Sequence, residues 1–434
     1  MKLKNQGKRL GGLLFLSFFL APGVHAKAAE KDATAEWYLN INRAMLHADD
    51  GYQKDTYFVD NYNKSTRLGV TGEKKLDNCF TVGGKLEVQY TNPNSATVSQ
   101  YNKNSSPLGA TEDNAFNVRQ ADTWIKGPFG QFSLGHGSMS SFTAIGSDLS
   151  GTADTFGYAG PWLMGGGIGF HRTGTGAVTT AAGAGPTVIQ AFTPYESVFY
   201  RQNRVRYDTP TFAGFTLSGS IYSGSIPAFA NLDGSSGAGT QKYGTDVTLR
   251  YSNSFDVIKL LGAISFNRLS KGNAVTTATP DLNNAKIWDG SFAVLHVPTG
   301  INGSVQYAQK TMANPGLTRT LFGGTAIDNG RITTFPTQKP KFSRVQLGLI
   351  SDLNCYGPTN FVVDYTQTKN NLENEGKGKG YGAGVVQQLK KVNSEIYMGV
   401  RRLKYTAPTA GVEFDKMLQA FVGVRVSLGG KLAS

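Results

Sequence analysis

The chain lacks long hydrophobic runs, is poor in charge, and has no dense cluster of basic residues. No segment after the N-terminus offers about 20 consecutive apolar residues, which excludes membrane-spanning helices. Charged residues make up 17% of the sequence, a low share for a soluble surface. The net charge is +13, but there is no run of five or more Lys and Arg residues, which argues against nucleic-acid binding.

The N-terminus predicts export from the cytoplasm. It has a basic start, an apolar run over about 10–21, and the sequence Val24-His25-Ala26. This order is typical of a secretory signal peptide with a small-residue cleavage site, so we expect residues 1–26 to be removed. The mature chain is then a single domain over 27–434.

Apolar and polar residues alternate from about Glu36 to Leu428, and no segment shows a helical period over three turns. In "NRVRYD", Val205 and Tyr207 share one face, while Arg204 and Arg206 share the other. This pattern predicts an all-β fold with sixteen strands: 36–46, 64–73, 79–90, 115–126, 129–136, 198–208, 212–222, 242–252, 257–268, 285–296, 301–310, 341–351, 359–369, 380–390, 393–404 and 417–428.

The gaps between these strands are alternately short and long, and the longest spans 137–197. Short turns alternating with long loops, on strands of about ten residues, are typical of a transmembrane antiparallel β-barrel. A soluble β-sandwich or propeller would also alternate, but its loops need not sort by length and no blade period is visible. We therefore predict that Val205, Tyr207, Leu217 and Ile221 face lipid, and that Arg204, Arg206 and Asp208 face a water-filled lumen.

The two cysteines, Cys79 and Cys355, fall in predicted short turns about ten strands apart. A disulfide requires Cα atoms within a few ångströms of each other, which this separation in a wide barrel does not allow. We expect both to be unpaired.

Three stretches resemble Gram-negative general porins: "STRLGVTGEKKLDN" (65–78), "NVRQADTWIKGPFGQFSLGHG" (117–137) and "NRVRYDTPTFAGFTLSGSIYS" (203–223). The resemblance implies a homotrimer in the outer membrane, with outer-membrane lipid, small hydrophilic solutes and ions as partners. It also implies a third loop, here 137–197, folded into the lumen. Porins usually end on an aromatic residue; here Leu428 takes that place, followed by an expected tail over 429–434.

The resemblance further implies that acids on the third loop face basic residues on the wall. Asp148 is the preferred acid and Asp154 the second. Arg67 is the best-supported wall residue, because the match and the strand alternation agree. Arg119 matches a basic position of the family, although alternation puts it on the outward face with Ala121. By alternation alone, the other lumen-facing candidates are Lys85, Arg204, Arg206, Arg250, Lys259, Arg344 and Arg425. Alternatively, such arginines are ion-paired lumen residues, and a loop acid merely anchors its loop.

No catalytic, cofactor or metal motif is apparent. The glycine-rich stretches "GGGIGF", "GKGKGYGAG" and "DGSSGAG" do not open a helix after a buried strand, so we interpret them as loops. His136 and Ser138 are the one adjacent pair that could serve a rim enzyme. The sequence favours passive diffusion of small hydrophilic solutes and ions, with mild anion preference. The alternatives are a substrate-specific channel for an anion or sugar, and a barrel that carries an adhesin or rim enzyme.

Overall fold

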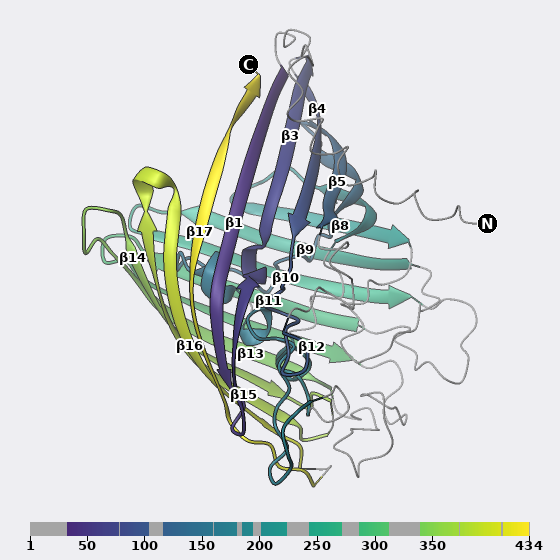
Figure 1. Ribbon diagram of the computed structural model, residues 1–434. Helices are drawn as coiled ribbons and strands as arrows, with labels where there is room; N and C mark the ends of the chain where they lie inside the picture. Colours follow the sequence, from purple (N-terminus) through teal and green to yellow (C-terminus); the bar gives the residue numbers. More distant parts are fainter. Residues whose placement is uncertain are drawn as a thin grey trace, which may run out of the picture.

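The computed structural model describes residues 33–77, 79–103, 116–158, 160–179, 185–193, 201–223, 243–270, 286–311, 339–372, 374–408 and 411–433. The predicted signal peptide and part of the third loop lie outside these ranges. All seventeen strand segments belong to one antiparallel sheet, which closes where β1 (Ala33–Asp49) pairs with β17 (Met417–Ala433) (Figure 1). Among the described residues, no helix is long and apolar enough to cross a membrane.

Seventeen segments fill sixteen positions around the barrel, because β2 and β3 lie end to end along β1. The outer half of β1 pairs with β2 (Lys54–Asp60), and its inner half pairs with β3 (Thr66–Asp77). The one-turn helix η1 (Tyr62–Lys64) separates them, and the Asn61 side chain caps it by accepting from the Asn63 N–H. The predicted sixteen-stranded barrel is confirmed, but β2 corrects the expectation that 47–63 is a loop.

The remaining strands follow chain order around the barrel, each antiparallel to the next. They are β4 (Phe80–Tyr90), β5 (Phe116–Gly127), β6 (Gly130–Ser138), β7 (Arg201–Asp208), β8 (Phe215–Ser223), β9 (Tyr243–Ser254), β10 (Ile258–Ser270), β11 (Lys286–His296), β12 (Ile301–Thr311), β13 (Lys341–Ser351), β14 (Thr359–Lys369), β15 (Lys377–Leu389) and β16 (Ser394–Thr406). A short helix, η9 (Lys390–Val392), forms the turn between β15 and β16.

Side chains alternate between the two faces of the wall as the sequence predicts. Val205, Leu217 and Ile221 are 46%, 47% and 48% exposed on the outer face, whereas Arg204 is 5% exposed on the inner face. Closure pairs the backbone groups of each strand with its neighbours, which a hydrocarbon environment requires. The outer face also carries aromatic contacts at the short-turn end, such as Phe132 with Tyr207 at 4.6 Å between ring centroids. Such girdles mark membrane interfaces.

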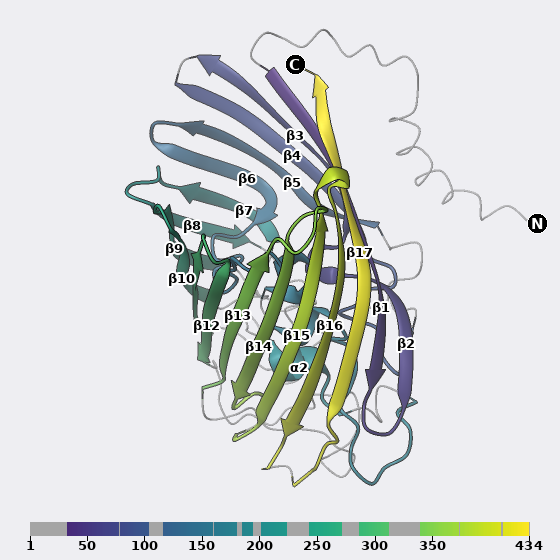
Figure 2. The ribbon, with the colours of Figure 1, turned by 90° about the vertical axis from the view of Figure 1, so that its left-hand side faces the viewer.

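The described part of the third loop lies inside the barrel, as predicted (Figure 2). It contains η4 (Ala153–Gly157), η5 (Pro161–Leu163) and α2 (Val188–Phe192). Its apolar side chains, among them Phe156, Phe170 and Phe192, form a buried cluster with inward side chains of the wall such as Tyr405 and Phe421. The apolar core therefore lies between this loop and one arc of the wall.

The C-terminal strand is longer than expected. β17 continues to Ala433, and Ala433 pairs with Ala35. Residues 429–433, predicted as a tail, therefore belong to the wall. The alternation that ended near Leu428 in the sequence is interrupted by Gly429 and Gly430, which carry no side chain to mark a face. Hydrogen bonding to β1 nevertheless extends the strand.

Cys79 and Cys355 are both exposed and unpaired, as expected. Cys79 follows β3 and Cys355 follows β13, and both lie in short turns. This end of the barrel is opposite the one that carries the long connections.

Candidate constriction site

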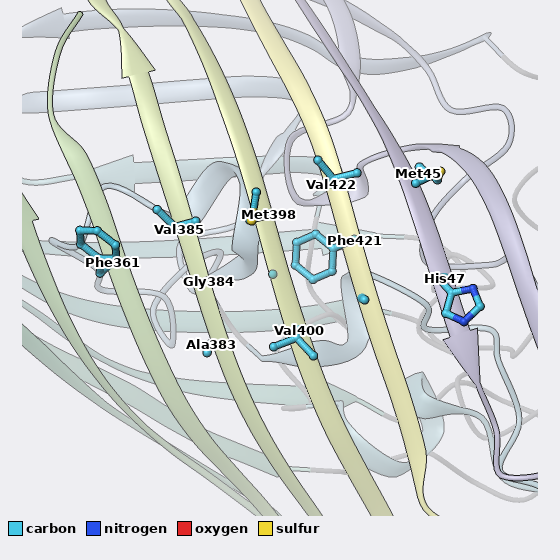
Figure 3. Close-up of a pocket in the computed structure, with 12 residues that line it drawn as sticks. Met45, His47, Phe361, Ala383, Gly384, Val385, Met398, Val400, Phe421 and Val422 are labelled. Atoms are coloured by element: carbon cyan, nitrogen blue, oxygen red, sulfur yellow. The ribbon is translucent and has the colours of Figure 1, made fainter. Parts of the chain in front are cut away.

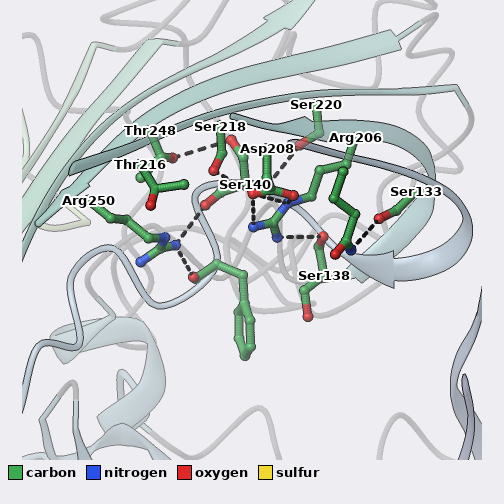
Figure 4. A network of polar contacts seen from close by, with 12 residues as sticks. Ser133, Ser138, Ser140, Arg206, Asp208, Thr216, Ser218, Ser220, Thr248 and Arg250 are labelled. Carbon is green, nitrogen blue, oxygen red and sulfur yellow. Dashed lines mark hydrogen bonds and ion pairs between the residues drawn. The ribbon is translucent and has the colours of Figure 1, made fainter. Parts of the chain in front are cut away.

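The third loop is held to one side of the wall by two arginines that hydrogen-bond its backbone (Figure 4). Arg206 of β7 donates to the carbonyl oxygens of Ser138 and Met139, and its guanidinium pairs with Asp208 at 2.6 Å. Arg250 of β9 donates to the Ser140 and Phe142 carbonyls, both at 2.7 Å. Both side chains are inward, as predicted, but each is engaged with the loop's own backbone.

Asp246 adds a carboxylate to the same anchor. It accepts from the Ser140 hydroxyl at 2.8 Å, and from the N–H and hydroxyl of Ser141 at 2.8 and 2.6 Å. The Ser220 hydroxyl also donates to it. Asp246 is 3% exposed, so these bonds replace the water that a buried carboxylate loses. The start of the loop is therefore fixed by charge-assisted bonds at several points.

A second anchor lies across the lumen, where Arg344 and Arg401 share Asp364. Arg344 approaches Asp364 to 2.5 Å and donates to the Tyr158 carbonyl at 2.9 Å. Arg401 lies 3.5 Å from Asp364, donates to the Phe156 carbonyl at 2.7 Å, and places its guanidinium 4.0 Å from the centroid of the Phe156 ring. Because all three ionic side chains are at most 3% exposed, this cluster is shielded from salt in the lumen.

Phe156 reaches the wall because glycines leave room for it. A Cβ at Gly384 would lie 2.5 Å from the Phe156 ring, and at Gly382 or Gly399 2.9 Å from it. Gly378, at the start of the same strand, leaves room for Phe192. The interpretation of "GKGKGYGAG" as loop glycine is therefore corrected: from Lys377 onward these residues form β15. Alternate glycines along a strand expose a flat backbone surface to one face.

The basic residues that do not hold the loop gather on β3 to β7. Arg119 pairs with Glu87 at 2.6 Å, and Lys85 lies 3.9 Å from the same carboxylate. Tyr38 also donates to Glu87. Next to them, Arg204 forms a bidentate pair with Asp122 at 2.7 and 2.8 Å.

Arg67 completes this group, which we name the basic wall. It is 9% exposed, and its guanidinium donates to the carbonyl and hydroxyl of Ser65. The basic wall therefore has four cations (Arg67, Lys85, Arg119 and Arg204) and two carboxylates (Glu87 and Asp122).

A β-bulge explains the position of Arg119. Gln120 pairs with Glu87, while Val118 pairs with the next residue, Val88, so Arg119 is one residue too many in β5. Such a bulge lets two consecutive side chains point to one face. Arg119 and Gln120 both reach Glu87, and Val118 is 53% exposed on the outer face. The alternation that placed Arg119 outward is therefore wrong at this point.

The two predicted loop acids have different surroundings. Asp148 accepts from the Ser150 N–H at 2.6 Å and from the Gln346 amide at 3.0 Å, so both its oxygens bind the loop or the wall. Asp154 instead contacts two cations, Lys64 at 2.5 Å and Arg425 at 3.5 Å, and its side chain is 41% exposed. The preferred acid, Asp148, thus anchors the loop, whereas Asp154 is the acid that faces basic side chains.

Several residues of the site were missed from the sequence. Arg401 could have been found, because Met398 and Val400 fix the outward face of β16 and leave Arg401 inward. Arg201, whose guanidinium lies 4.5 Å from the Phe142 ring centroid, could not, since it stands at a strand end. Lys64 lies in η1, where alternation carries no information. Lys259, a predicted lumen residue, is exposed next to the short turn before β10.

At the end that carries the long connections, the third loop joins the segment between β16 and β17. The Asp415 N–H donates to the His171 carbonyl and the Thr173 N–H to the Glu413 carbonyl. The His171 ring lies 2.8 Å from the Asp415 carboxylate, and Thr173 donates to the other oxygen. The hydrogen bond with His171 holds the pKa of Asp415 below its ordinary value. This contact fixes a further point of the loop.

The outer face has a groove of about 710 Å³ across β14, β15, β16, β17 and β1 (Figure 3). It forms where Ala383, Gly384, Gly399 and Ala420 leave space between larger apolar side chains such as Met398 and Phe361. Because Met398 is 54% and Phe361 39% exposed on the outward face, the groove is outside the lumen. It forms no part of the constriction.

Comparison with known proteins places this geometry in context. A family model described as Gram-negative porin matches residues 14–408. No curated protein sequence matches the chain. The solved structures that it resembles include the anion-selective porin from Comamonas acidovorans, with a TM-score of 0.55 and 15% identity over 91% of this chain and 100% of that one.

Two further structures are similar. OmpT of Vibrio cholerae in its trimer form has a TM-score of 0.52 and 11% identity, covering 92% of this chain and 100% of that one. Salmonella typhi OmpF in complex with daunomycin has a TM-score of 0.51 and 12% identity, covering 91% of this chain and 97% of that one. At these identities, the likeness concerns the fold.

Proposed function

The chain belongs to the family of Gram-negative porins, and from this membership we propose that it is a passive outer-membrane diffusion channel for small hydrophilic solutes and ions, with mild preference for anions. The third loop narrows the lumen, which supports exclusion by size. We propose no enzymatic activity. His136 shares the outward face of β6 with Leu134, and the described residues show no hydrogen bond between His136 and Ser138.

The observation that carries anion preference is the composition of the basic wall. Its four cations face two carboxylates, so a positive excess remains after Glu87 and Asp122 are neutralised. Excess fixed charge along a narrow aqueous passage raises the local concentration of counter-ions. The titles of the similar structures include an anion-selective porin, which agrees with this direction.

We further propose a homotrimer in outer-membrane lipid. Outward-facing basic residues cluster at the end of the barrel that carries the long connections, directly beyond apolar and aromatic positions. We name them the basic belt: Arg268, Lys286, Lys341, Lys369, Lys377, Lys379, Arg402 and Lys404.

Like charges oppose each other along this belt. Lys369 pairs in register with both Lys341 and Lys377, and Lys379 pairs with Lys404. Such pairs repel in isolation. Negatively charged phosphate groups in the surrounding lipid would turn this repulsion into attraction, so we propose that the basic belt contacts phosphorylated headgroups.

Ion current through the refolded protein in a planar bilayer tests the proposal. We expect stepwise openings in groups of three, and a reversal potential of the anion-selective sign under a salt gradient. A reversal potential of the cation-selective sign would refute the anion preference. A folded protein that carries no current would refute the channel itself.

A further inference from the structure

Besides the constriction, the lumen wall contains a small cavity on β3 to β7. Its volume is about 290 Å³, at the lower end of the range of small-molecule pockets. Trp124 of β5 lines it, together with inward side chains such as Glu73, Gln120, Gln131 and Ser133. It lies nearer the short turns than the third loop does, because Trp124 stands three residues before the end of β5.

Trp124 is held as a platform against the wall. Gly83 lies beneath its indole: a Cβ at Gly83 would be 2.4 Å from ring atoms Cε2 and Nε1, so a side chain there would displace the ring. The indole N–H donates to Glu73 at 3.1 Å, which fixes the ring in its plane. One face therefore packs on backbone, and the other is available to the cavity.

An indole face in an aqueous lumen is costly, because apolar surface in contact with water is unfavourable. The surrounding groups do not cover it, and Trp124 remains partly exposed. A solute with its own apolar face could remove this surface from water. Aromatic rings that are large, rigid and amphipathic serve binding sites in this way.

The charges around the cavity cancel. Glu73, Asp122 and Asp208 face Lys85, Arg204 and Arg206, and two of these three pairs are close, Arg204 with Asp122 at 2.7 Å and Arg206 with Asp208 at 2.6 Å. The site therefore offers little net charge, unlike the basic wall beside it. Its carboxylates, amides and hydroxyls can accept from and donate to several hydroxyl groups.

We propose that this cavity is a binding subsite for a neutral pyranose sugar, whose ring carries a flat C–H face bordered by hydroxyls. The C–H face stacks on Trp124, and the hydroxyls bind Glu73, Gln120 and Gln131. The inference rests on the proposed channel function and adds a solute class to it. A bound sugar would partly occlude the lumen near the short-turn end.

The experiment compares glucose with sorbitol in planar bilayers. The two are close in size and number of hydroxyls, but sorbitol is open-chained and lacks the ring face. We expect glucose to reduce single-channel conductance with saturation, and sorbitol to reduce it linearly, as viscosity does. Trp124→Leu should weaken the half-saturating glucose effect about tenfold, and Trp124→Phe should restore part of it. The matched control is Trp288→Leu, on the outward face of β11, which should behave as the unmodified protein.

The outcomes separate this inference from the proposed function. Current without saturation by glucose, or with the same saturation in Trp124→Leu, would overturn the sugar subsite and leave the channel intact. Absence of current in the unmodified protein would refute the channel as well. If Trp124→Leu does not fold, loss of saturation in Gln131→Leu supports the site, and unchanged saturation there overturns it.

Discussion

At the scale of single residues, the arginines of the lumen divide by what they bind. Arg206, Arg250, Arg344 and Arg401 donate to carbonyl oxygens of the third loop, so their charges serve to hold it. Arg67 donates instead to Ser65 of its own strand region, and leaves the loop untouched in the contacts described. The type and parity of a residue are the same in both groups; the loop decides which arginines it uses.

We predict that Arg67→Glu shifts ion selectivity toward cations, because it reverses a charge of the basic wall. The measurement is the reversal potential under a salt gradient, with Arg402→Glu as control. Arg402 is exposed on the outward face of β16, so the same reversal there should leave selectivity unchanged. An unaltered permeability ratio in Arg67→Glu would make this arginine a bystander.

At the scale of elements, the glycines of β15 and the third loop form a matched pair of surfaces. Phe156 fits where Gly382, Gly384 and Gly399 have no side chains, and Phe192 fits above Gly378. The strand thus supplies a flat seat and the loop supplies the aromatic side chains. The arginine clamp at Asp364 then fixes the adjoining backbone.

We predict that Phe156→Ala loosens the loop. Truncating a buried Phe to Ala typically costs about 3–5 kcal/mol, which here falls on the contact between loop and wall. Single-channel conductance and the size limit for neutral polymers should both rise. Phe212→Ala, in the turn between β7 and β8 and 83% exposed, is the matched control and should change neither. Equal conductance in the two variants would show that Phe156 does not hold the constriction.

At the scale of the whole molecule, the two ends of the barrel differ. One end has short turns and aromatic contacts; the other has the long connections and the basic belt. The cross-strand register brings the lysines of the belt together, although they are far apart in sequence. This asymmetry suits a bilayer whose outer surface carries phosphate.

We predict that Lys369→Gln has opposite effects in two surroundings. In a neutral detergent it should raise thermal stability slightly, since it relieves two like-charge pairs of roughly 0.2–1 kcal/mol each. In the presence of phosphorylated lipid, the stabilisation that the lipid confers should be smaller than in the unmodified protein. Lys391→Gln, in the short turn before β16, serves as the control. Equal lipid stabilisation of Lys369→Gln and the unmodified protein would exclude the contact.

Much of the fold could be predicted from the sequence, because alternation records which face of a strand meets lipid. The sixteen positions and the inward placement of Arg204, Arg206, Arg250 and Arg344 follow from period-2 patterning. The pattern failed where the backbone departs from a regular strand. β2 was missed because it is short and ends at η1, and Arg119 was assigned to the wrong face because a bulge shifts the parity of β5.

The sequence by itself determined the barrel, its inner and outer faces and the position of its long third loop, since these depend on local order along the chain. The tertiary structure alone decided which acid meets which base. Asp154 rather than Asp148 contacts cations, and Arg401 meets Asp364, because the loop crosses the lumen and settles on strands distant in sequence. Such pairings depend on distances between segments that are remote in the chain, and these distances arise when the barrel closes around its loop.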